Sequence, residues 1–407
     1  MNQHRMLQLL HLAAVLALAA PTTSCTKSTG DKPLYTNAST TKVVRDSLND
    51  GVTVSRHTAI TRAVAKASAA VVGINVTEVF EQQVYDPFQG MMDQMFQSDP
   101  FFRQFFGNQR RGPQTQRYQL KELGSGFFIS PDGYILTNDH VAGRASKIII
   151  TTTSGKQYDA KLVSTDPVND VALLKIDATD LPYLQLGNSD DVEVGEWAIA
   201  MGNPFGLFEK NNKPTVTVGV ISNTGVNLGL EGGKNFRDML QTDAAISSGN
   251  SGGPLLNING EVVGMNATIF STAQNGQGAG SIGLGFAIPV NKIKKIVDDF
   301  RSGKKIARNS SIGVTVQTLD DDLKQQFGLT SESGVLVVSV ARGSIAERAG
   351  IEAGDVITSV SGEKVTSDDD FYSTIADHAV GDILAINVTR GDSGGVIRLK
   401  VPPPPAK

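Results

Sequence analysis

The sequence has 407 residues, which is enough for two or three domains, and a net charge of -4 that gives no electrostatic reason to expect a nucleic acid partner. Hydrophobic residues make up 40% of the chain, as in soluble globular proteins, while 42 glycines and few aromatic residues favour short strands joined by tight turns. A single cysteine, Cys25, excludes an intramolecular disulfide and a cysteine-based zinc cluster. We expect no metal and no other cofactor.

Residues 1–24 predict an export signal, because an apolar run from Leu7 to Ala20 follows a short polar start. The run is shorter than the roughly 20 residues that cross a bilayer, so we expect no permanent spanning helix. Cys25 follows directly and is similar to the acylated cysteine of bacterial lipoproteins, which would anchor the exported chain to a membrane. Thr22 stands where that pattern usually has Leu, so ordinary cleavage near Ala20 stays open as the alternative.

Turn signals divide most of the remaining chain into short strands. From residue 124 to 289, runs rich in Val, Ile, Leu and Thr alternate with turns, a spacing typical of a β-barrel or sandwich. One amphipathic helix is predicted over residues 292–310, and a first domain is placed at residues 58–300. A second, smaller domain that again alternates strands and turns is predicted at residues 301–402.

Three segments depart from these patterns. Residues 25–57 are polar and lack periodicity, which predicts a flexible tether, and residues 403–407 form a tail. Residues 80–118 place many phenylalanines and methionines among polar residues, and such a segment is hard to fit inside a small core.

The glycine-rich segment from Gly249 to Gly253 surrounds Ser251. Glycines let the backbone turn tightly and bring amide groups close to a reacting carbonyl, as stabilisation of a tetrahedral intermediate demands. Ser251 is therefore a candidate nucleophile. A glycine-rich turn without chemistry is the alternative at this point.

A serine at neutral pH needs a base, which is usually a histidine oriented by a carboxylate. His140 is the candidate, because it follows two strand-like runs around a Pro-Asp-Gly turn and is expected at a strand end beside a loop. Asp170 directly precedes a fully apolar strand and is preferred to its competitors Asp166 and Asp177. The chain order His, Asp, Ser is the chymotrypsin order.

Five separated motifs, in chain order, are GSGFFISPDGYILTNDHV, DPVNDVALLKID, LGNSDDVEVGEWAIAMGNPFGL, QTDAAISSGNSGGPLLNINGEVVGMN and GLGFAIPV. Together they resemble the HtrA/Deg family of trypsin-like serine proteases over residues 58–402. The resemblance implies a mainly β protein, with a chymotrypsin-like double β-barrel followed by one PDZ domain. It also implies His140 as general base, Asp170 as its orienting partner and Ser251 as nucleophile.

The same resemblance implies an oxyanion hole at Gly249, Asn250 and Ser251, with backbone amides as donors. Ser247 and Ser248 stand where the family usually has Asn-Pro. Whether the resting enzyme already has a formed hole or must be switched on is therefore left open.

A substrate pocket is implied at Ala245, Ile246, Leu284, Gly285 and Phe286. Trypsin-like enzymes that prefer basic residues carry an acidic group at the position of Ala245. We therefore expect a pocket for small aliphatic side chains, with the loop over residues 267–285 as its other wall.

In the second domain, Ile312, Gly313, Val314 and Thr315 resemble the carboxylate-binding loop and edge strand of a PDZ domain. A peptide C-terminus would add a strand there, beside a groove-lining helix predicted from Ser367 to His378. A small β domain that only packs on the protease is the alternative.

The resemblance implies an endopeptidase of the bacterial periplasm that cleaves unfolded or damaged exported proteins. It also implies a homo-oligomer, either a trimer or a multiple of one, and a regulatory role for the long loop at residues 80–118. Exposed Phe and Met suit that role or the holding of unfolded chains, and a partly disordered insertion is the alternative. A signalling protease and a catalytically silent chaperone or scaffold are the alternative functions.

Overall fold

The computed structural model describes residues 57–84, 114–203, 213–247, 249–267, 283–301, 306–309, 311–327, 333–391 and 393–403, with backbone only at 79–84 and 114–122. The predicted export signal, Cys25 and all but the last residue of the tether lie outside these ranges. Within them, none of the helices has the length and apolar character needed to cross a membrane.

A short helix leads into the first strand, as the alanine-rich and valine-rich sequence predicts. Thr58 caps α2 (Ala59–Ala67) by accepting a hydrogen bond from the Thr61 backbone N–H at 3.2 Å. A 3-10 turn, η2 (Ser68–Ala70), then redirects the chain into β1 (Val71–Val84). The valines and isoleucine at the start of β1 are fully buried, so compact structure begins here.

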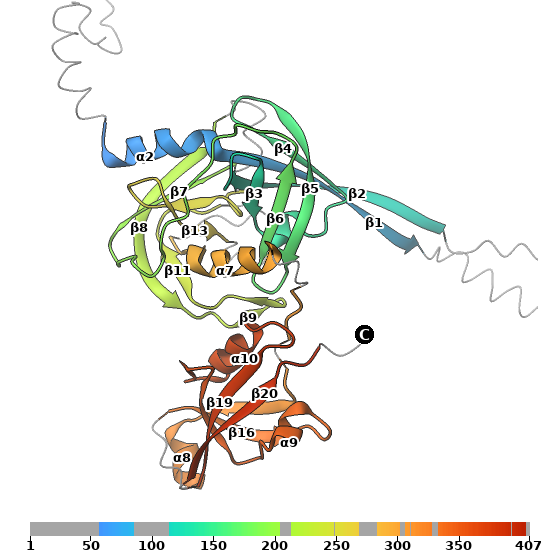
Figure 1. Ribbon diagram of the computed structural model, residues 1–407, viewed down its shortest axis with the longest axis vertical. Coiled ribbons are helices and arrows are strands. Elements are labelled where there is room, and N and C mark those ends of the chain that lie inside the picture. The colour runs from blue at the N-terminus through green and yellow to red at the C-terminus, as the bar shows by residue number, and fades with distance from the viewer. Residues whose placement is uncertain are drawn as a thin grey trace, which may run out of the picture. The chain divides into compact units, whose positions relative to one another are not determined.

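Six antiparallel strands close the first barrel in the order β1-β2-β3-β6-β5-β4 (Figure 1). The strands that follow β1 are β2 (Gln114–Phe128), β3 (Tyr134–Thr137), β4 (Lys147–Thr151), β5 (Gln157–Asp166) and β6 (Val171–Ile176). Strand β6 is buried at every position except the half-buried Lys175, which explains why its other residues are apolar. The predicted turn before β3 is present, with Gly133 at φ 96° donating to the Ser130 carbonyl.

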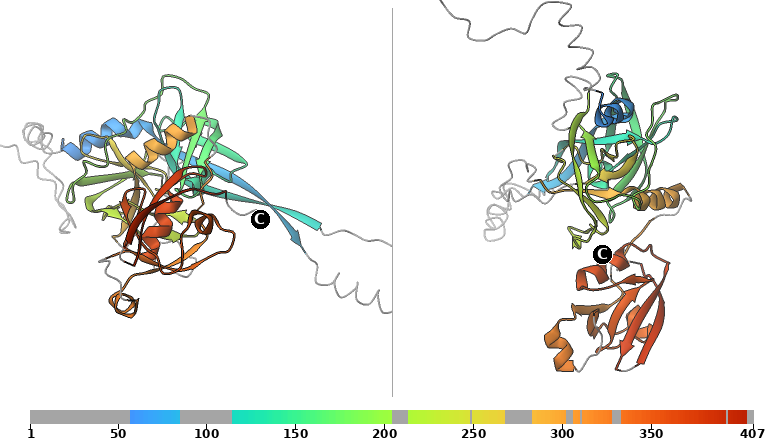
Figure 2. Two further views of the ribbon diagram at one scale, coloured as in Figure 1. Left: turned by 60° about the horizontal axis from the view of Figure 1, so that its bottom comes forward. Right: turned by 90° about the vertical axis from the view of Figure 1, so that its left-hand side faces the viewer.

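Strands β1 and β2 continue as a two-stranded ribbon to the pair Val84 and Gln114, and the ribbon extends away from the barrel (Figures 1 and 2). The two ends of the predicted loop at residues 80–118 are therefore strand. Residues 85–113, which include the Phe-rich and Met-rich segment, lie outside the described residues. The regulatory role of that segment stays a prediction.

The second barrel has the strand order β11-β14-β13-β12-β7-β8. Its strands are β7 (Trp197–Gly202), β8 (Thr215–Val226), β11 (Met239–Thr242), β12 (Pro254–Leu256), β13 (Val262–Asn266) and β14 (Gly285–Pro289). A separate hairpin of β9 (Leu230–Glu231) and β10 (Lys234–Asn235) lies in the connection between β8 and β11. Two closed barrels confirm the predicted fold class for this part of the chain.

Helix α7 (Val290–Arg301) follows the second barrel and buries Ile293, Ile296 and Phe300. The prediction of one helix to residue 310 is wrong at its end, because residues 306–309 are not helical and Arg308 forms an isolated β-bridge with Ala379. The apolar spacing stops at Phe300, so no further turn would have a face to bury.

The remaining residues form a separate sheet in the order β15-β16-β17-β19-β20, with β18 beside β17. Its strands are β15 (Val314–Thr318), β16 (Val335–Val340), β17 (Val356–Val360), β18 (Glu363–Lys364), β19 (Ile383–Arg390) and β20 (Ser393–Lys400). Its helices are α8 (Asp321–Phe327), α9 (Ile345–Ala349) and α10 (Asp368–Ala376). This sheet and its helices have their own apolar core, which supports the predicted second domain.

Helix α10 begins where the sequence predicts. The Ser367 hydroxyl accepts from the Asp370 backbone N–H at 3.1 Å, which is half of a capping box. The Asp370 carboxylate accepts from the Thr366 N–H at 3.1 Å, one residue before the N–H that the standard box would use. The hydrogen bond to Thr366 keeps the pKa of Asp370 below its ordinary value although burial acts in the opposite direction.

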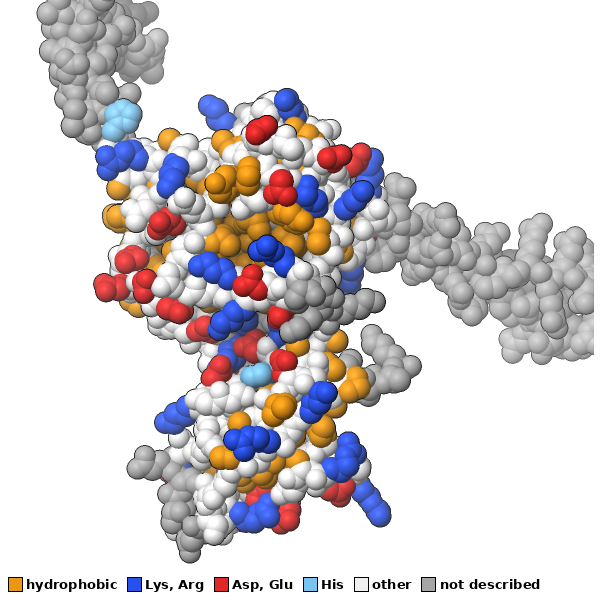
Figure 3. Space-filling view, viewed as in Figure 1, with side chains coloured by type: hydrophobic (Ala, Val, Ile, Leu, Met, Phe, Trp, Pro, Cys, Tyr) orange, Lys and Arg blue, Asp and Glu red, His pale blue; other side chains and the backbone are white. Residues whose placement is uncertain are grey.

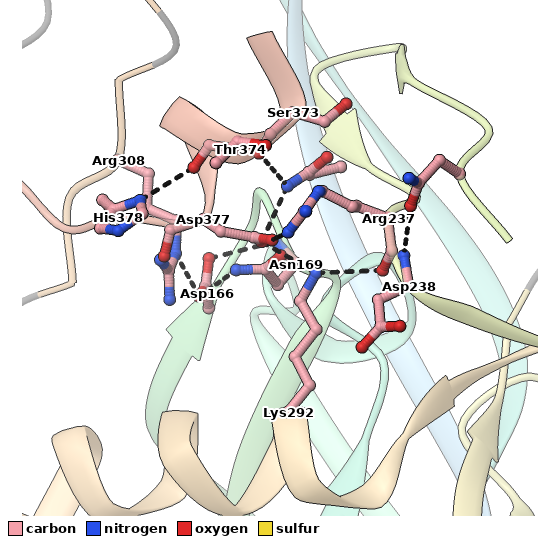
Figure 4. A network of polar contacts seen from close by, with 12 residues as sticks. Asp166, Asn169, Arg237, Asp238, Lys292, Arg308, Ser373, Thr374, Asp377 and His378 are labelled. Atoms are coloured by element: carbon pink, nitrogen blue, oxygen red, sulfur yellow. Dashed lines mark hydrogen bonds and ion pairs between the residues drawn. The ribbon is translucent and has the colours of Figure 1, made fainter. Parts of the chain in front are cut away.

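Polar contacts join the second barrel to α10, and side chains of both charges gather at this junction in Figure 3. Asp377, which caps the C-terminus of α10, lies 2.8 Å from Lys292 and 3.2 Å from Arg237. Asn235 donates to the Asp377 carboxylate at 2.8 Å and to the Ser373 carbonyl at 2.9 Å (Figure 4). Asp377 therefore accepts from donors on two segments, residues 235–237 and helix α7.

Arg308, in the connection between the two domains, contacts the first barrel. Its Nε donates to the Asp166 carboxylate at 2.6 Å, and both side chains are nearly or fully buried. Asn169 donates to the same carboxylate through its backbone and its side chain (Figure 4). Asp166 is thus a buried acceptor that fixes the turn before β6 and the start of the second domain.

We predict that Arg308→Met lowers stability by about 3 kcal/mol, because it leaves the Asp166 carboxylate buried without its cation. Differential scanning calorimetry of the full chain should show a melting temperature lower by roughly 5–10 °C. Arg342→Met, at an exposed position, is the control and should melt like the wild type. An Arg308→Met protein that melts with the control would show that the ion pair contributes nothing.

Candidate active site

Asp170 occupies the turn between β5 and β6 with an unusual backbone conformation. Its φ is 56°, in the left-handed region that asparagine and aspartate tolerate best among non-glycine residues. The side chain is only 2% exposed, and Asn138 donates from its amide to the Asp170 carbonyl at 2.9 Å. A strained and buried carboxylate of this kind is typical of a functional position.

His140 meets this carboxylate from α5 (Asp139–Ala142). Its Nδ1 lies 2.8 Å from Asp170 Oδ2 and 3.0 Å from Oδ1, and its backbone N–H donates to Oδ1 at 3.0 Å. A carboxylate at Nδ1 favours the tautomer whose proton is on Nδ1, which leaves Nε2 as the basic nitrogen. The expected position at a strand end is slightly wrong, because β3 ends at Thr137 and His140 belongs to a one-turn helix.

Of the three candidate aspartates, Asp170 is the one that contacts His140. Asp166 is bonded to Arg308 and Asn169, and Asp177 is exposed just after β6. The catalytic role of Asp170 stays a prediction, and its contact with His140 is the observation that supports it.

Lys234 is a further partner of Asp170 that the sequence did not indicate. Its Nζ lies 2.8 Å from Asp170 Oδ1, and it comes from β10 of the small hairpin. Burial of Asp170 favours its neutral form, but the hydrogen bond from His140 and the charges of His140 and Lys234 keep the pKa of Asp170 below its ordinary value. No local pattern could have found Lys234, because the contact joins residues 64 positions apart.

Ser251 lies in the turn before β12 and is 6% exposed. Its carbonyl accepts from the Ser125 N–H of β2 at 3.0 Å, which fixes the turn of the second barrel to the first. A Cβ on Gly252 would lie 2.3 Å from the Thr137 hydroxyl and 3.0 Å from the Asn138 nitrogen. The turn that contains the predicted nucleophile therefore packs against Thr137 and Asn138, which directly precede α5 and His140.

The loop before Ser251 makes a tight turn. Asn250 donates from its backbone to the Ser247 carbonyl at 2.9 Å, and Gly249 at φ 95° supplies the positive angle that type II turns need at their third position. The Ser125 hydroxyl donates to the Gly249 carbonyl and accepts from the Asn203 N–H. Backbone geometry of the expected oxyanion loop is thus held by the first barrel, while Ser248 lies outside the described residues.

The residues expected around the substrate pocket lie on two adjoining segments. Ile246 is fully buried beside Gly285, where a Cβ would come within 3.0 Å of the Ile246 side chain. Phe286 is buried in β14, whereas Leu284 and Ala245 are exposed. Residues 268–282 of the predicted opposite wall lie outside the described residues.

The residues expected to bind a peptide in the second domain lie at the edge of its sheet. Ile312 and Val314 are buried, Thr315 is exposed, and Gly313 has a φ of 90° with no room for a Cβ beside Ser344. Among the described strands, β15 stands at the end of the sheet order and pairs with β16 alone. Its free edge is the place where a peptide strand could add.

The groove helix reaches this edge through Tyr372. Its hydroxyl accepts from the Val316 N–H at 3.3 Å and lies 3.5 Å from the Val314 carbonyl. At the other end of the strand, Thr318 donates to the Asp368 carboxylate at 2.7 Å. The Tyr372 hydroxyl therefore occupies a backbone N–H of β15 that an added strand would use, while the contact of Thr318 with the Asp368 carboxylate involves only side chains.

Among the described residues, no group of three or more His, Cys, Asp or Glu side chains is placed to hold a metal ion. The structure shows the pair of His140 and the buried Asp170 carboxylate, with the Ser251 turn bonded to β2 of the first barrel.

Two family models match the chain. Residues 124–265 match the trypsin-like peptidase domain, and residues 310–401 match the PDZ domain.

Relatives and solved structures give a consistent result. A probable periplasmic serine endoprotease, DegP-like, of Chlamydia trachomatis serovar D is 44% identical over 313 residues, 75% of this chain and 60% of the relative. The DegP-like relative of Pseudomonas fulva is 37% identical over 367 residues, which cover 88% of this chain and 73% of the relative. The HtrA-type protease AlgW with decapeptide matches with a TM-score of 0.63 and 34% identity, covering 85% of this chain and 99% of AlgW. The chain spans 52% to 63% of the length of the first four curated relatives.

We predict that Gly252→Ala leaves the barrels folded but displaces Ser251. The new Cβ would lie 2.3 Å from the Ser125 carbonyl oxygen, and φ 82° is strained for alanine. The rate at which a fluorophosphonate labels Ser251 should fall by about 100-fold, as expected for a displacement near 1 Å. Gly395→Ala, where a Cβ has open space, is the matched control. Labelling of Gly252→Ala at the control rate would contradict the packing argument.

Proposed function

Because the chain belongs to the HtrA-type, DegP-like family of trypsin-like serine endoproteases, we propose that it hydrolyses peptide bonds in unfolded or damaged exported proteins. The observation that carries this proposal is the contact of His140 Nδ1 with the buried Asp170 carboxylate at 2.8 Å. The relatives are named periplasmic, which supports action in the bacterial periplasm.

In the proposed reaction, Ser251 Oγ attacks the carbonyl carbon of the scissile bond as its proton passes to His140 Nε2. Asp170 stabilises the imidazolium that forms. The tetrahedral intermediate then collapses, and His140 donates the proton to the leaving amine, so that the C–N bond breaks and an acyl-enzyme remains. Water, deprotonated by His140, hydrolyses this ester and restores the Ser251 hydroxyl.

The oxyanion of each tetrahedral intermediate would be stabilised by the backbone N–H groups of Gly249 and Ser251 in the loop that also contains Asn250. The hydrogen bond from Ser125 to the Gly249 carbonyl supports this role, because it fixes one side of the loop to the first barrel. Ile246, buried beside Gly285, supports a shallow apolar pocket for small aliphatic side chains.

The second domain would bind peptide C-termini at Ile312, Gly313, Val314 and Thr315. The free edge of β15 supports added-strand binding, and the Gly313 turn would present its amides to the terminal carboxylate. The Tyr372 hydroxyl occupies the Val316 N–H, so a peptide must displace it. Homo-oligomer formation, in trimers or their multiples, and a lipid anchor at Cys25 remain proposals.

We predict that Ser251→Ala abolishes digestion of casein, with a loss of at least about 10⁴-fold in kcat, because the remaining groups cannot form an ester. Wild-type protein should form a fluorophosphonate adduct at Ser251, and His140→Ala should slow that reaction. Ser393→Ala removes an exposed hydroxyl from the second domain and serves as the control. If wild type and Ser251→Ala leave casein equally intact, with and without added C-terminal peptides, the protease proposal fails.

We also predict that Tyr372→Phe tightens binding of a C-terminal peptide by roughly 3- to 10-fold, because a competing hydrogen bond worth about 1 kcal/mol is removed. The phenyl ring can keep the edge contact with Phe371. Fluorescence anisotropy with a labelled apolar peptide would measure the affinity. Tyr183→Phe, at an exposed position, is the control. Unchanged affinity in Tyr372→Phe would show that the hydroxyl does not compete.

A further inference from the structure

The contact between Lys234 and Asp170 places a second positive group on a carboxylate that already holds His140. Lys234 Nζ and the His140 backbone N–H both contact Asp170 Oδ1, at 2.8 and 3.0 Å. The lysine side chain is 24% exposed and the aspartate side chain 2% exposed, so water screens this pair only partly. A permanent cation therefore lies beside the imidazole that must accept a proton.

The position of Lys234 is fixed by the backbone of its hairpin. Lys234 pairs with Glu231 across the two strands, and the next residue, Asn235, donates from its N–H to the Val168 carbonyl at 2.6 Å. Val168 is two residues before Asp170 in the same turn. One backbone hydrogen bond and one ion pair thus join the hairpin to the Asp170 turn of the first barrel. These two contacts fix the position of Lys234 beside Asp170.

We propose that Lys234 is a positioning residue that acts through Asp170 and opposes protonation of His140. The ammonium partly neutralises the carboxylate, so Asp170 stabilises a His140 imidazolium less. His140 therefore stays unprotonated, and able to act as a base, down to a lower pH. The proton from Ser251 still passes to His140, and Lys234 keeps its own protons throughout. This inference rests on the proposed protease function.

The charged and titratable groups that face Asp170 are His140, Lys234 and Asp139. Burial raises the pKa of Asp139, whose carboxylate accepts a hydrogen bond from Thr165, so part of its negative charge is lost at acidic pH. The charge of Lys234 acts against this increase in the Asp139 pKa. A difference between Lys234 variants therefore reports the effect of the lysine on both carboxylates.

Lys234→Met should move the acid limb of the pH profile of kcat/KM to higher pH by about one unit, because the carboxylate is then free to stabilise the imidazolium. Lys234→Arg keeps the charge and should keep the limb within about 0.3 units of the wild type. Lys161→Met removes the same charge from an exposed position on β5 and is the matched control. Its limb should match the wild type.

A second readout does not need activity. In full-length Ser251→Ala protein with ¹³Cε1-labelled histidine, the midpoint of the His140 NMR titration should rise by the same amount when Lys234 becomes Met. His140→Ala assigns the resonance. Equal midpoints with and without Lys234 would overturn the inference, as would a Lys234→Met enzyme that only loses its plateau rate. If the wild type shows no peptidase activity, the proposed function fails, while the NMR titration still decides the role of Lys234.

Discussion

The buried carboxylate of Asp170 is the constraint on which the arrangement of the two barrels depends. An isolated ionised carboxylate is costly inside a protein unless charges or hydrogen-bond donors compensate it. Here the donors come from both barrels, since His140 belongs to α5 of the first and Lys234 to the hairpin of the second. The donors that compensate the Asp170 charge therefore hold α5 of the first barrel and the hairpin of the second barrel against each other.

Two buried aspartates, Asp166 and Asp170, lie at the two ends of the same turn. The side chain that each one contacts determines whether it serves the fold or the chemistry. Asp166 contacts Arg308, whose guanidinium stays charged at any physiological pH, so this pair can only hold the fold. Asp170, four positions later, contacts the imidazole of His140, the type of side chain that most often acts as an acid or base in enzymes. The identical side chain is structural at one end of the turn and suited to chemistry at the other.

The sequence predicts those residues of the site whose evidence lies in the neighbouring sequence, and it does not predict those that depend on distant contacts. Ser251 and His140 lie in long motifs whose glycines and strand periods are readable directly, and Asp170 could be chosen because an apolar strand follows it. Lys234 and Tyr372 could not be found, because their contacts depend on how a hairpin and a helix pack against distant strands. The end of α7 was missed because polar residues after Phe300 continue to look compatible with a helix although they have no face to bury.

Strand β10 contacts both the Asp170 carboxylate and the end of α10 in the second domain. Successive side chains of a strand point in opposite directions, so the two residues of β10 contact different parts of the protein. Lys234 contacts Asp170, while Asn235 donates to the Ser373 carbonyl and the Asp377 carboxylate of α10. Two adjacent residues of β10 therefore link the buried Asp170 carboxylate to the C-terminal end of α10.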